Sequence, residues 1–251
     1  MWHFFKRNTS KYNLEWLGTD IHSHILPGID DGSTSVAQSI ALLDSLMQLG
    51  ISTFYFTPHV YQEVHPNTPT SIATAYQTLQ QQYTVSGGYA AEYMVDSHFH
   101  SIVSNANEQE LLTLPGNFIL IEMSYIHESR TIDQDIFKLL TLGYKPILAH
   151  PERYIYFHGS IENIKRLRDR GCYLQLNLLS PTGYYGSREK TAAKHLIDAG
   201  LIDFVGTDVH HSKHTKVLEQ YYTTHNINTL FKDCRVKNQE IREQVQAVLQ
   251  Q

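Results

Sequence analysis

Two histidines separated by one residue, with a pair of aspartates shortly after them, form the segment of this chain with the clearest chemical potential. His22 and His24 lie at the end of a predicted strand, 18–22, and Asp30 and Asp31 follow in a turn containing proline and glycine. Residues two apart on a strand point to the same face, so both imidazoles can reach one point. This spacing favours a metal site, although such a pair also occurs in ordinary cores and surfaces.

Metal-competent side chains follow five further predicted strands in the same way. In a parallel α/β fold the carboxyl ends of the strands share one edge, so these side chains are expected to meet there. A charge inside a buried strand, such as Glu122, is costly unless it is paired or bound to a metal. The set expected to converge as metal ligands is His22, His24, Asp31, His59, Glu92, Glu122, His150, Asp208 and His210.

Imidazole and carboxylate donors without thiolate suit Mn²⁺, Fe²⁺ or Zn²⁺, with Mg²⁺ as a further option. Because this set exceeds what one ion can use, we expect two or three divalent ions. Glu122, which lies mid-chain in the set, is the expected bridging carboxylate, and Asp20 is expected to orient a ligand histidine. A second pair, His98 and His100, falls in a predicted helix, where residues two apart face different directions, and is expected to lie on the surface.

The elements that must position these residues alternate between strand and helix. Buried strands are predicted at 18–22, 51–57, 88–94, 118–123, 146–149, 172–176 and 203–206, and helices at 36–47, 71–83, 96–112, 132–142, 161–170, 188–199, 215–222 and 238–249. This alternation, with no linker, predicts an α/β fold: a parallel (β/α) TIM-like barrel of about seven strands, short of the usual eight. Residues 1–17 are expected to form an N-terminal extension that packs on the barrel, and residues 18–251 one domain.

Composition excludes several classes of function. The net charge of −5 and the absence of a dense Lys/Arg run argue against nucleic acid as a partner. The two cysteines, Cys172 and Cys234, are far apart, which fits a reducing compartment, and neither is followed six residues later by arginine, so a cysteine-nucleophile phosphatase loop is not expected. No signal peptide or membrane span is indicated, and the expected location is the cytoplasm. Gly-rich nucleotide motifs are absent, and oligomeric state is not indicated.

Six short motifs in order resemble one known family. They are D-I-H-S-H-I-L-P-G-I-D-D-G, T-P-H, the strand that carries Glu92, L-I-E-M-S, A-H-P-E-R-Y and T-D-V-H, between Thr19 and His210. The set resembles the polymerase and histidinol phosphatase (PHP) family, and within it the tyrosine-protein phosphatases of bacterial capsule and exopolysaccharide operons. The resemblance implies a distorted β/α barrel with a three-metal, usually Mn²⁺-dependent, centre. It also implies hydrolysis of phosphotyrosine on a partner tyrosine kinase.

Carried over by motif, the resemblance implies the nine ligands given above, with Arg153 of the A-H-P-E-R-Y motif holding the phosphate. Relatives tend to place an arginine shortly after the D-x-H motif, where this chain has Lys213 among histidines. Lysine is a point charge and not a bidentate fork, so whether it replaces that second clamp is open. Asp30, His127 or a metal-bound water is the candidate general acid that would protonate the leaving phenolate.

Three other interpretations keep part of this assignment. The same centre would serve a small phosphomonoesterase, such as a histidinol phosphatase. An amidohydrolase also begins with H-x-H, but commonly uses a strand-end lysine where this chain offers Glu122. The metals could also be structural in a non-catalytic interaction protein.

Overall fold

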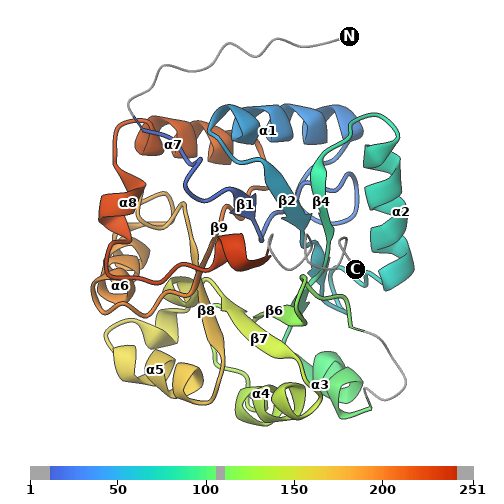
Figure 1. The fold of residues 1–251 in the computed structure, drawn as a ribbon. Coiled ribbons are helices and arrows are strands. Elements are labelled where there is room, and N and C mark those ends of the chain that lie inside the picture. The colour runs from blue at the N-terminus through green and yellow to red at the C-terminus, as the bar shows by residue number, and fades with distance from the viewer. Residues whose placement is uncertain (1–11, 106–110, 242–251) are drawn as a thin grey trace.

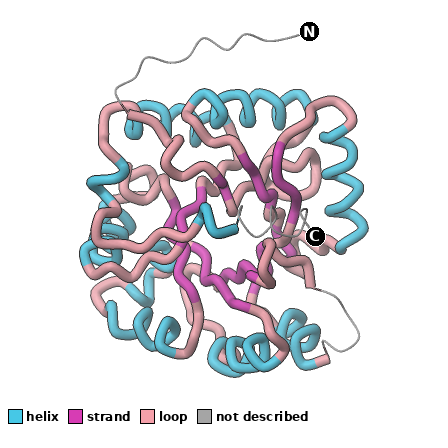
Figure 2. The backbone as a smooth tube through the Cα atoms, in the orientation of Figure 1, coloured by secondary structure: helices cyan, strands magenta, loops and turns pink. Residues whose placement is uncertain are grey.

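The computed structural model describes residues 12–105 and 111–241, which form two parallel sheets with helices on the outside (Figures 1 and 2). The first sheet has the order β1-β2-β4, and the second the order β3-β5-β6-β7-β8-β9. All the strand pairs in both sheets are parallel. The strands are β1 (Thr19–Asp20), β2 (Thr53–Phe56), β3 (His59–Val60), β4 (Ser86–Tyr89), β5 (Glu92–Met94), β6 (Phe118–Glu122), β7 (Lys145–Ala149), β8 (Tyr173–Asn177) and β9 (Phe204–Gly206).

The strands lie where the sequence predicts them, but two regions are interrupted. The predicted strand 51–57 forms β2, which ends at Phe56, and β3 follows beyond the predicted range, after Pro58; the predicted strand 88–94 divides into β4 and β5. Proline has no amide hydrogen to extend a ladder, which accounts for the first break. Each interrupted segment contributes one piece to each sheet. The described residues therefore contain nine strands in two sheets, where the sequence predicts one sheet of about seven.

The segments that follow β1 and β9 lie side by side. Ser23 forms an isolated parallel bridge with Val209, the amide of Asp208 donates to the carbonyl of His22 at 2.8 Å, and the amide of His24 donates to the carbonyl of Val209 at 3.0 Å. These bonds replace a continuous ladder. They place two of the expected metal-binding motifs side by side.

Helices cover the outer faces of the strands (Figure 1). Strands such as β6, in which all five residues are buried, are apolar almost throughout because parallel strands are covered on both faces. The helices are α1 (Val36–Gln48), α2 (Pro69–Gln80), α3 (Ser97–Ser104), α4 (Ile132–Thr141), α5 (Ile161–Asp169), α6 (Ser187–Asp198), α7 (Ser212–Tyr222) and α8 (Ile227–Leu230), with short 3₁₀ turns η1 (Pro151–Arg153) and η2 (Ile155–Phe157). The sequence did not predict α8.

The ends of the described chain differ from the sequence expectations in detail. Leu14 and Leu17 are fully buried in the main core, and the amide of Leu14 donates to the carbonyl of Leu49, so residues 12–17 are packed against the domain. The rest of the predicted extension, 1–11, lies outside the described residues, as do 106–110 of the predicted helix 96–112. The predicted helix 238–249 starts at Asn238, and its part beyond Ile241 is likewise outside them.

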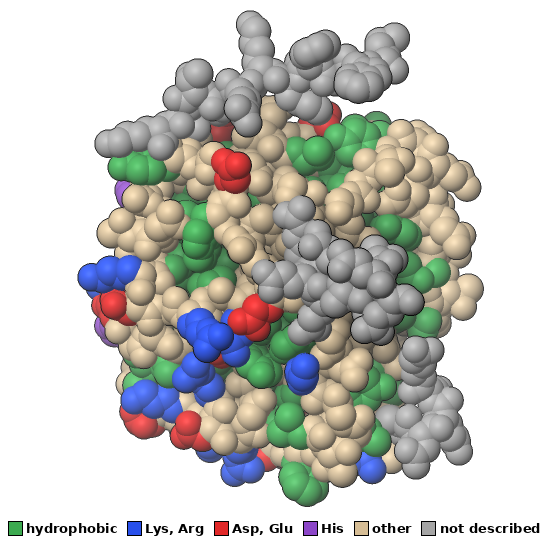
Figure 3. Space-filling model, in the orientation of Figure 1, with side chains coloured by type: hydrophobic (Ala, Val, Ile, Leu, Met, Phe, Trp, Pro, Cys, Tyr) green, Lys and Arg blue, Asp and Glu red, His purple; other side chains and the backbone are tan. Residues whose placement is uncertain are grey.

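The surface carries charges of both signs. On the face shown in Figure 3, Lys and Arg side chains lie among Asp and Glu side chains. Arg166 on α5 and Arg170, just after it, pair with Asp133, and Arg168 on α5 pairs with Asp203. Within the described residues, every helix is too short or too polar to cross a lipid bilayer.

Candidate metal centre

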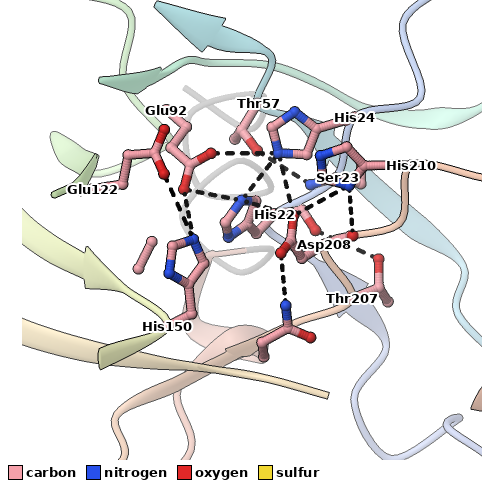
Figure 4. A network of polar contacts seen from close by, with 12 residues as sticks. His22, Ser23, His24, Thr57, Glu92, Glu122, His150, Thr207, Asp208 and His210 are labelled. Atoms are coloured by element: carbon pink, nitrogen blue, oxygen red, sulfur yellow. Dashed lines mark hydrogen bonds and ion pairs between the residues drawn. The ribbon is translucent and has the colours of Figure 1, made fainter. Parts of the chain in front are cut away.

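All nine expected metal ligands meet at the carboxyl ends of the strands. Their side chains fall into four overlapping groups, within each of which one ligand atom per residue lies within 4.8 Å of the others. Figure 4 shows most of them pointing toward a common centre. The four groups are His24, Asp31, His59 and His210; His22, His150 and Asp208; His22, His24 and Glu92; and His59, Glu92 and Glu122. The sequence expectation that these residues converge agrees with the geometry.

Two of these residues have a positive φ angle, which directs their side chains toward the cluster. His150 follows β7 with a φ of 34°, and Asp208 follows β9 with a φ of 49°. Non-glycine residues rarely adopt positive φ, at a cost of about 1–3 kcal/mol each. Close packing also fixes Gly206, because a Cβ there would lie 2.6 Å from the Cβ of His22 and 2.8 Å from Nε2 of Gln175. The backbone next to the cluster is therefore strained at His150 and Asp208 and tightly packed at Gly206.

Three of the histidines are held by their Nδ1 atoms. Nδ1 of His22 lies 2.9 Å from Oε1 of Gln175, and Gln175 Nε2 donates to the carbonyl of Leu176 at 2.7 Å, which fixes that oxygen toward the imidazole. Nδ1 of His24 lies 2.8 Å from a carboxylate oxygen of Asp30. Since these partners accept hydrogen bonds, each Nδ1 must donate, and each Nε2 faces the cluster. Nδ1 of His210 is held in the same way, 2.9 Å from the carbonyl of Asp208.

The facing Nε2 atoms give a test of whether the residues fit metal ions. Nε2 of His22 and Nε2 of His24 are only 3.2 Å apart, and both lie 3.2–3.5 Å from oxygens of Glu92 and Asp208. Two neutral imidazoles would point lone pairs at each other and at carboxylates, so the arrangement calls for positive charge between them, which a bound metal ion would supply. Among the described residues, Oε2 of Glu92 accepts no hydrogen bond although it is buried. The donor set therefore fits divalent ions.

Glu92 is the central carboxylate of the cluster. Its oxygens lie within 3.4 Å of nitrogens of four histidines, which are His22, His24, His59 and His150. Glu122 lies 2.8 Å from His59 and 3.9 Å from His150. Chain order indicated Glu122 as the bridging carboxylate, whereas the geometry favours Glu92. Position along the chain does not determine which strand end lies nearest the centre.

The cluster stabilises its carboxylates electrostatically. Burial alone would raise the pKa of Glu92, but His22 and His150 hold it well below its ordinary value. Burial is likewise outweighed at Asp208, whose pKa is held low by His22 and His210. Burial lowers the pKa of His150 and so favours its neutral, ligating form. The site thus presents ionised carboxylates, as cation binding requires.

Arg153 lies beside the cluster. Its Nη1 donates to Oδ2 of Asp208 at 2.8 Å, and its guanidinium lies between two aromatic rings, 4.5 Å from the centroid of Tyr125 and 4.1 Å from that of Tyr185. Its side chain is 18% exposed. All three residues line a pocket of about 430 Å³ together with members of the cluster such as His150 and Asp208, and we call it the metal pocket. Within this pocket, the guanidinium of Arg153 can bind an anion such as a phosphate through two N–H donors.

Comparison with known proteins identifies the family. The family described as "Capsular polysaccharide synthesis, CpsB/CapC" matches residues 18–228. The chain belongs to this family.

Named relatives agree with that result. The tyrosine-protein phosphatase YwqE of Bacillus subtilis (strain 168) is 30% identical over 198 residues, which cover 77% of this chain and 78% of the relative. The tyrosine-protein phosphatase CpsB of Streptococcus pneumoniae is 28% identical over 204 residues, which cover 76% of this chain and 82% of the relative. A solved structure of YwqE and CpsB, described as "unique metal-dependent tyrosine phosphatases", matches with a TM-score of 0.71 and 28% identity over 87% of this chain and 96% of that one. The resemblance inferred from the motifs is confirmed.

Two expected roles in this CpsB/CapC family site do not agree with the geometry. The side chain of Asp30 is buried, and although burial opposes ionisation, His24 holds its pKa below the ordinary value, so the ionised carboxylate orients the His24 imidazole. His127 lines a neighbouring cleft and not the metal pocket, and its Nδ1 lies 3.2 Å from the hydroxyl of Ser124. Neither side chain is placed as the general acid.

Three further sequence expectations can be compared with the structure. Asp20 is buried and accepts hydrogen bonds from the amides of His22 and Thr207 and from the Thr207 hydroxyl. The sequence expectation was that it would orient a ligand imidazole, but these bonds hold the backbone and Thr207. Lys213 is exposed on α7 and does not line the metal pocket, although its neighbours His211 and His214 do. His98 is exposed on α3, as expected for the second histidine pair, and His100 instead pairs with Asp135 at 2.6 Å.

Sequence reasoning missed several residues that complete the family's site here. Gln175 and Asn177 stand two apart at the end of β8, and Asn177 donates to Asp208 at 2.6 Å and to the hydroxyl of Tyr185 at 3.0 Å. Glu152, fully buried, accepts from Ser180 at 2.7 Å, and burial raises its pKa to about 7. The signal was present: a polar pair at a strand end, with the same spacing as the first histidine pair.

Proposed function

We propose that this protein is a metal-dependent protein-tyrosine phosphatase that hydrolyses phosphotyrosine on a partner protein. The observation that carries the proposal is the convergence of nine imidazole and carboxylate side chains beside one partly buried arginine held between two tyrosine rings. The names of the relatives, YwqE and CpsB, support it. The reaction would be the hydrolysis of a phosphate monoester, with water as the nucleophile.

We assign the nine residues as ligands of two or three divalent ions, with Mn²⁺ preferred and Fe²⁺, Zn²⁺ or Mg²⁺ as alternatives. Bound ions would supply neutralisation of phosphate charge and activation of water. Gln175 and Asp30 would keep His22 and His24 in the ligating tautomer. We assign Glu92 as the carboxylate shared between ions, because it belongs to two of the four groups.

Arg153 would bind the phosphate. One nitrogen of its guanidinium contacts Asp208, which leaves other N–H donors for phosphate oxygens. A guanidinium held in place binds an anion more strongly than a mobile one, because it does not have to be ordered on binding. Tyr125 and Tyr185 form aromatic walls of the metal pocket, which suit the phenyl ring of a phosphotyrosine. The phenolate, with a parent pKa of about 10, is a fair leaving group, so no protein general acid is required.

The biological assignment extends the same proposal. We infer that the substrate is the phosphorylated tail of a bacterial tyrosine kinase in the control of polysaccharide biosynthesis, in keeping with the family's description. We place the reaction in the cytoplasm, on the basis of two free cysteines. Residues 18–251 would form the phosphatase domain, and its two sheets would represent a distorted β/α barrel.

Hydrolysis assays with matched substrates test the proposal. With Mn²⁺ present, we expect kcat/KM for a phosphotyrosine peptide to exceed that for histidinol phosphate and for the matching phosphoserine peptide by at least about tenfold, or 1.4 kcal/mol. Equal or reversed preference would indicate a small-molecule phosphomonoesterase. The variant His150→Ala should keep its circular dichroism spectrum and lose hydrolysis, while the exposed control His98→Ala should keep both. Unfolding of His150→Ala would instead indicate structural metals.

A further inference from the structure

A second, larger cleft adjoins the metal pocket. Its volume is about 950 Å³, and it shares Tyr61, Met94 and Tyr125 with the metal pocket. The start of α3 and the loop 123–131, between β6 and α4, supply most of its walls. Because the shared residues belong to both linings, a chain that leaves the metal pocket past Tyr125 enters this cleft, which we call the flanking cleft.

The loop 123–131 is tied to the rest of the fold at several points. The amide of Ile155 donates to the carbonyl of Tyr125 at 3.0 Å, and Glu128 forms an ion pair with Arg166 of α5. Arg166 also binds Asp133 at the start of α4. These contacts hold the flanking cleft open in the structure, so a ligand would not have to order it.

Most of the charged groups in the flanking cleft are already engaged. Asp96 caps α3 by accepting from the amide of Phe99 at 2.8 Å, Glu128 is paired with Arg166, and His100 contacts Asp135. Arg130 is exposed, and its side chain has no hydrogen bond or ion pair with any residue in 12–105 or 111–241. The described part of the cleft therefore holds one unpaired, permanently charged cation.

The same loop exposes apolar surface at the mouth of the cleft. Ile126 is 71% exposed between two residues that line the cleft, Tyr125 and His127. Met94 and Met123 line its wall. A surface that combines exposed aliphatic and aromatic side chains with one free arginine is typical of peptide recognition.

We propose that the flanking cleft binds the substrate polypeptide on one side of the phosphotyrosine and that Arg130 pairs with an acidic side chain there. The inference rests on the proposed function, since it takes the phosphotyrosine to occupy the metal pocket. An extended peptide advances about 3.3–3.6 Å per residue, so the first few residues beside the phosphotyrosine would lie in the flanking cleft. Arg130 is separate from the ligand set and from Arg153, so it would select the substrate without taking part in hydrolysis.

The test compares peptides with a substrate too small to reach the cleft. Phosphotyrosine amide reports on the metal pocket alone, and two peptide pairs carry Glu or Lys on the amino side or on the carboxyl side of the phosphotyrosine. For the wild type we expect Glu to be preferred over Lys on one side, by about fivefold in kcat/KM. In Arg130→Glu this preference should reverse, with hydrolysis of phosphotyrosine amide unchanged.

Two further variants separate the contributions. Arg235→Glu is the matched charge reversal, because Arg235 is 86% exposed near the start of β9, away from the strand ends that form the site, and it should behave as the wild type. Ile126→Ser should lower kcat/KM for all the peptides that enter the cleft and leave phosphotyrosine amide unaffected.

Each failure has a distinct signature. If Arg130→Glu leaves the Glu/Lys preference unchanged, or lowers hydrolysis of phosphotyrosine amide as much as that of the peptides, the flanking cleft is not a peptide subsite. That result would leave the proposed function intact. If the wild type hydrolyses neither phosphotyrosine amide nor any peptide, the proposed function is wrong and this inference is wrong with it.

Discussion

Nη1 of Arg153 lies 2.8 Å from Oδ2 of Asp208, while Oδ1 of the same carboxylate lies 3.3 Å from Nε2 of His24 and 3.5 Å from Nε2 of His22. One aspartate thus joins the expected phosphate-binding cation to the expected metal ligands. The strained backbone of Asp208, with a φ of 49°, allows it to face both. A change at Asp208 would therefore disturb both groups of residues, whereas a change at Arg153 leaves the expected metal ligands in place.

Arg153→Lys keeps the positive charge but removes the planar fork. We expect kcat/KM for phosphotyrosine amide to fall by about 10²–10³, since a lost positioned donor typically costs that much, while the metal content stays the same. Steady-state kinetics and elemental analysis of the same sample check this. A proportional loss of metal would show that Arg153 acts mainly through Asp208.

Gln175→Leu removes the acceptor that fixes Nδ1 of His22. The imidazole is then free to adopt the other tautomer, and we expect metal affinity to fall by about 10- to 100-fold, with activity recovered at higher Mn²⁺ concentration. Gln77→Leu, at an exposed position on α2, is the matched control. Titration of apoprotein with Mn²⁺ measures the change. Wild-type affinity in Gln175→Leu would contradict the assigned orientation of His22.

Tyr125 covers one face of the Arg153 guanidinium at 4.5 Å. Tyr125→Phe keeps the ring and should leave kcat/KM for phosphotyrosine amide nearly unchanged. Tyr125→Ala removes a cation–π contact worth about 0.5–2 kcal/mol, so we expect a loss of about 2- to 30-fold, seen mainly in KM. The two variants measured side by side decide this, and equal effects would assign the contribution to the hydroxyl instead.

The two cysteines should differ in reactivity. Cys172 is 2% exposed, and burial raises its pKa to about 12, while Cys234 is partly exposed, with a pKa that burial also raises. A raised pKa means less thiolate at pH 8, so in the native protein iodoacetamide should modify Cys234 first and Cys172 only as the chain unfolds. Peptide mass spectrometry before and after denaturation measures both. Early modification of Cys172 would contradict its burial in the main hydrophobic core.

Local patterns predicted much of this architecture because strand and helix signals are local. The run 118–123 is apolar and bounded by turns, and it forms β6 as expected. The interruption at Pro58 and the division of 88–94 into β4 and β5 depend on which sheet each half joins, which is a property of the assembled fold. For the same reason chain order indicated Glu122 as the central carboxylate, and the geometry indicates Glu92.

Some residues of the candidate site could be predicted from the sequence and others could not. Residues that stand at strand ends, such as His22 and Asp208, could be identified from type and position. Residues that support them could not be identified from type alone: Gln175 is an ordinary polar residue until the structure places it 2.9 Å from His22. The sequence also could not show that His127 lines the neighbouring cleft or that Asp30 pairs with His24, because the direction of a side chain is decided by the loop that carries it.

The central claim is that the nine converging side chains hold the ions on which hydrolysis depends. The metal content per chain is measured by inductively coupled plasma mass spectrometry. Phosphotyrosine hydrolysis is measured on the same samples, before chelation, after chelation and after Mn²⁺ is restored. We expect two or three ions per chain and activity that falls and returns with them. Full hydrolysis by a sample that holds less than one ion per chain would contradict it.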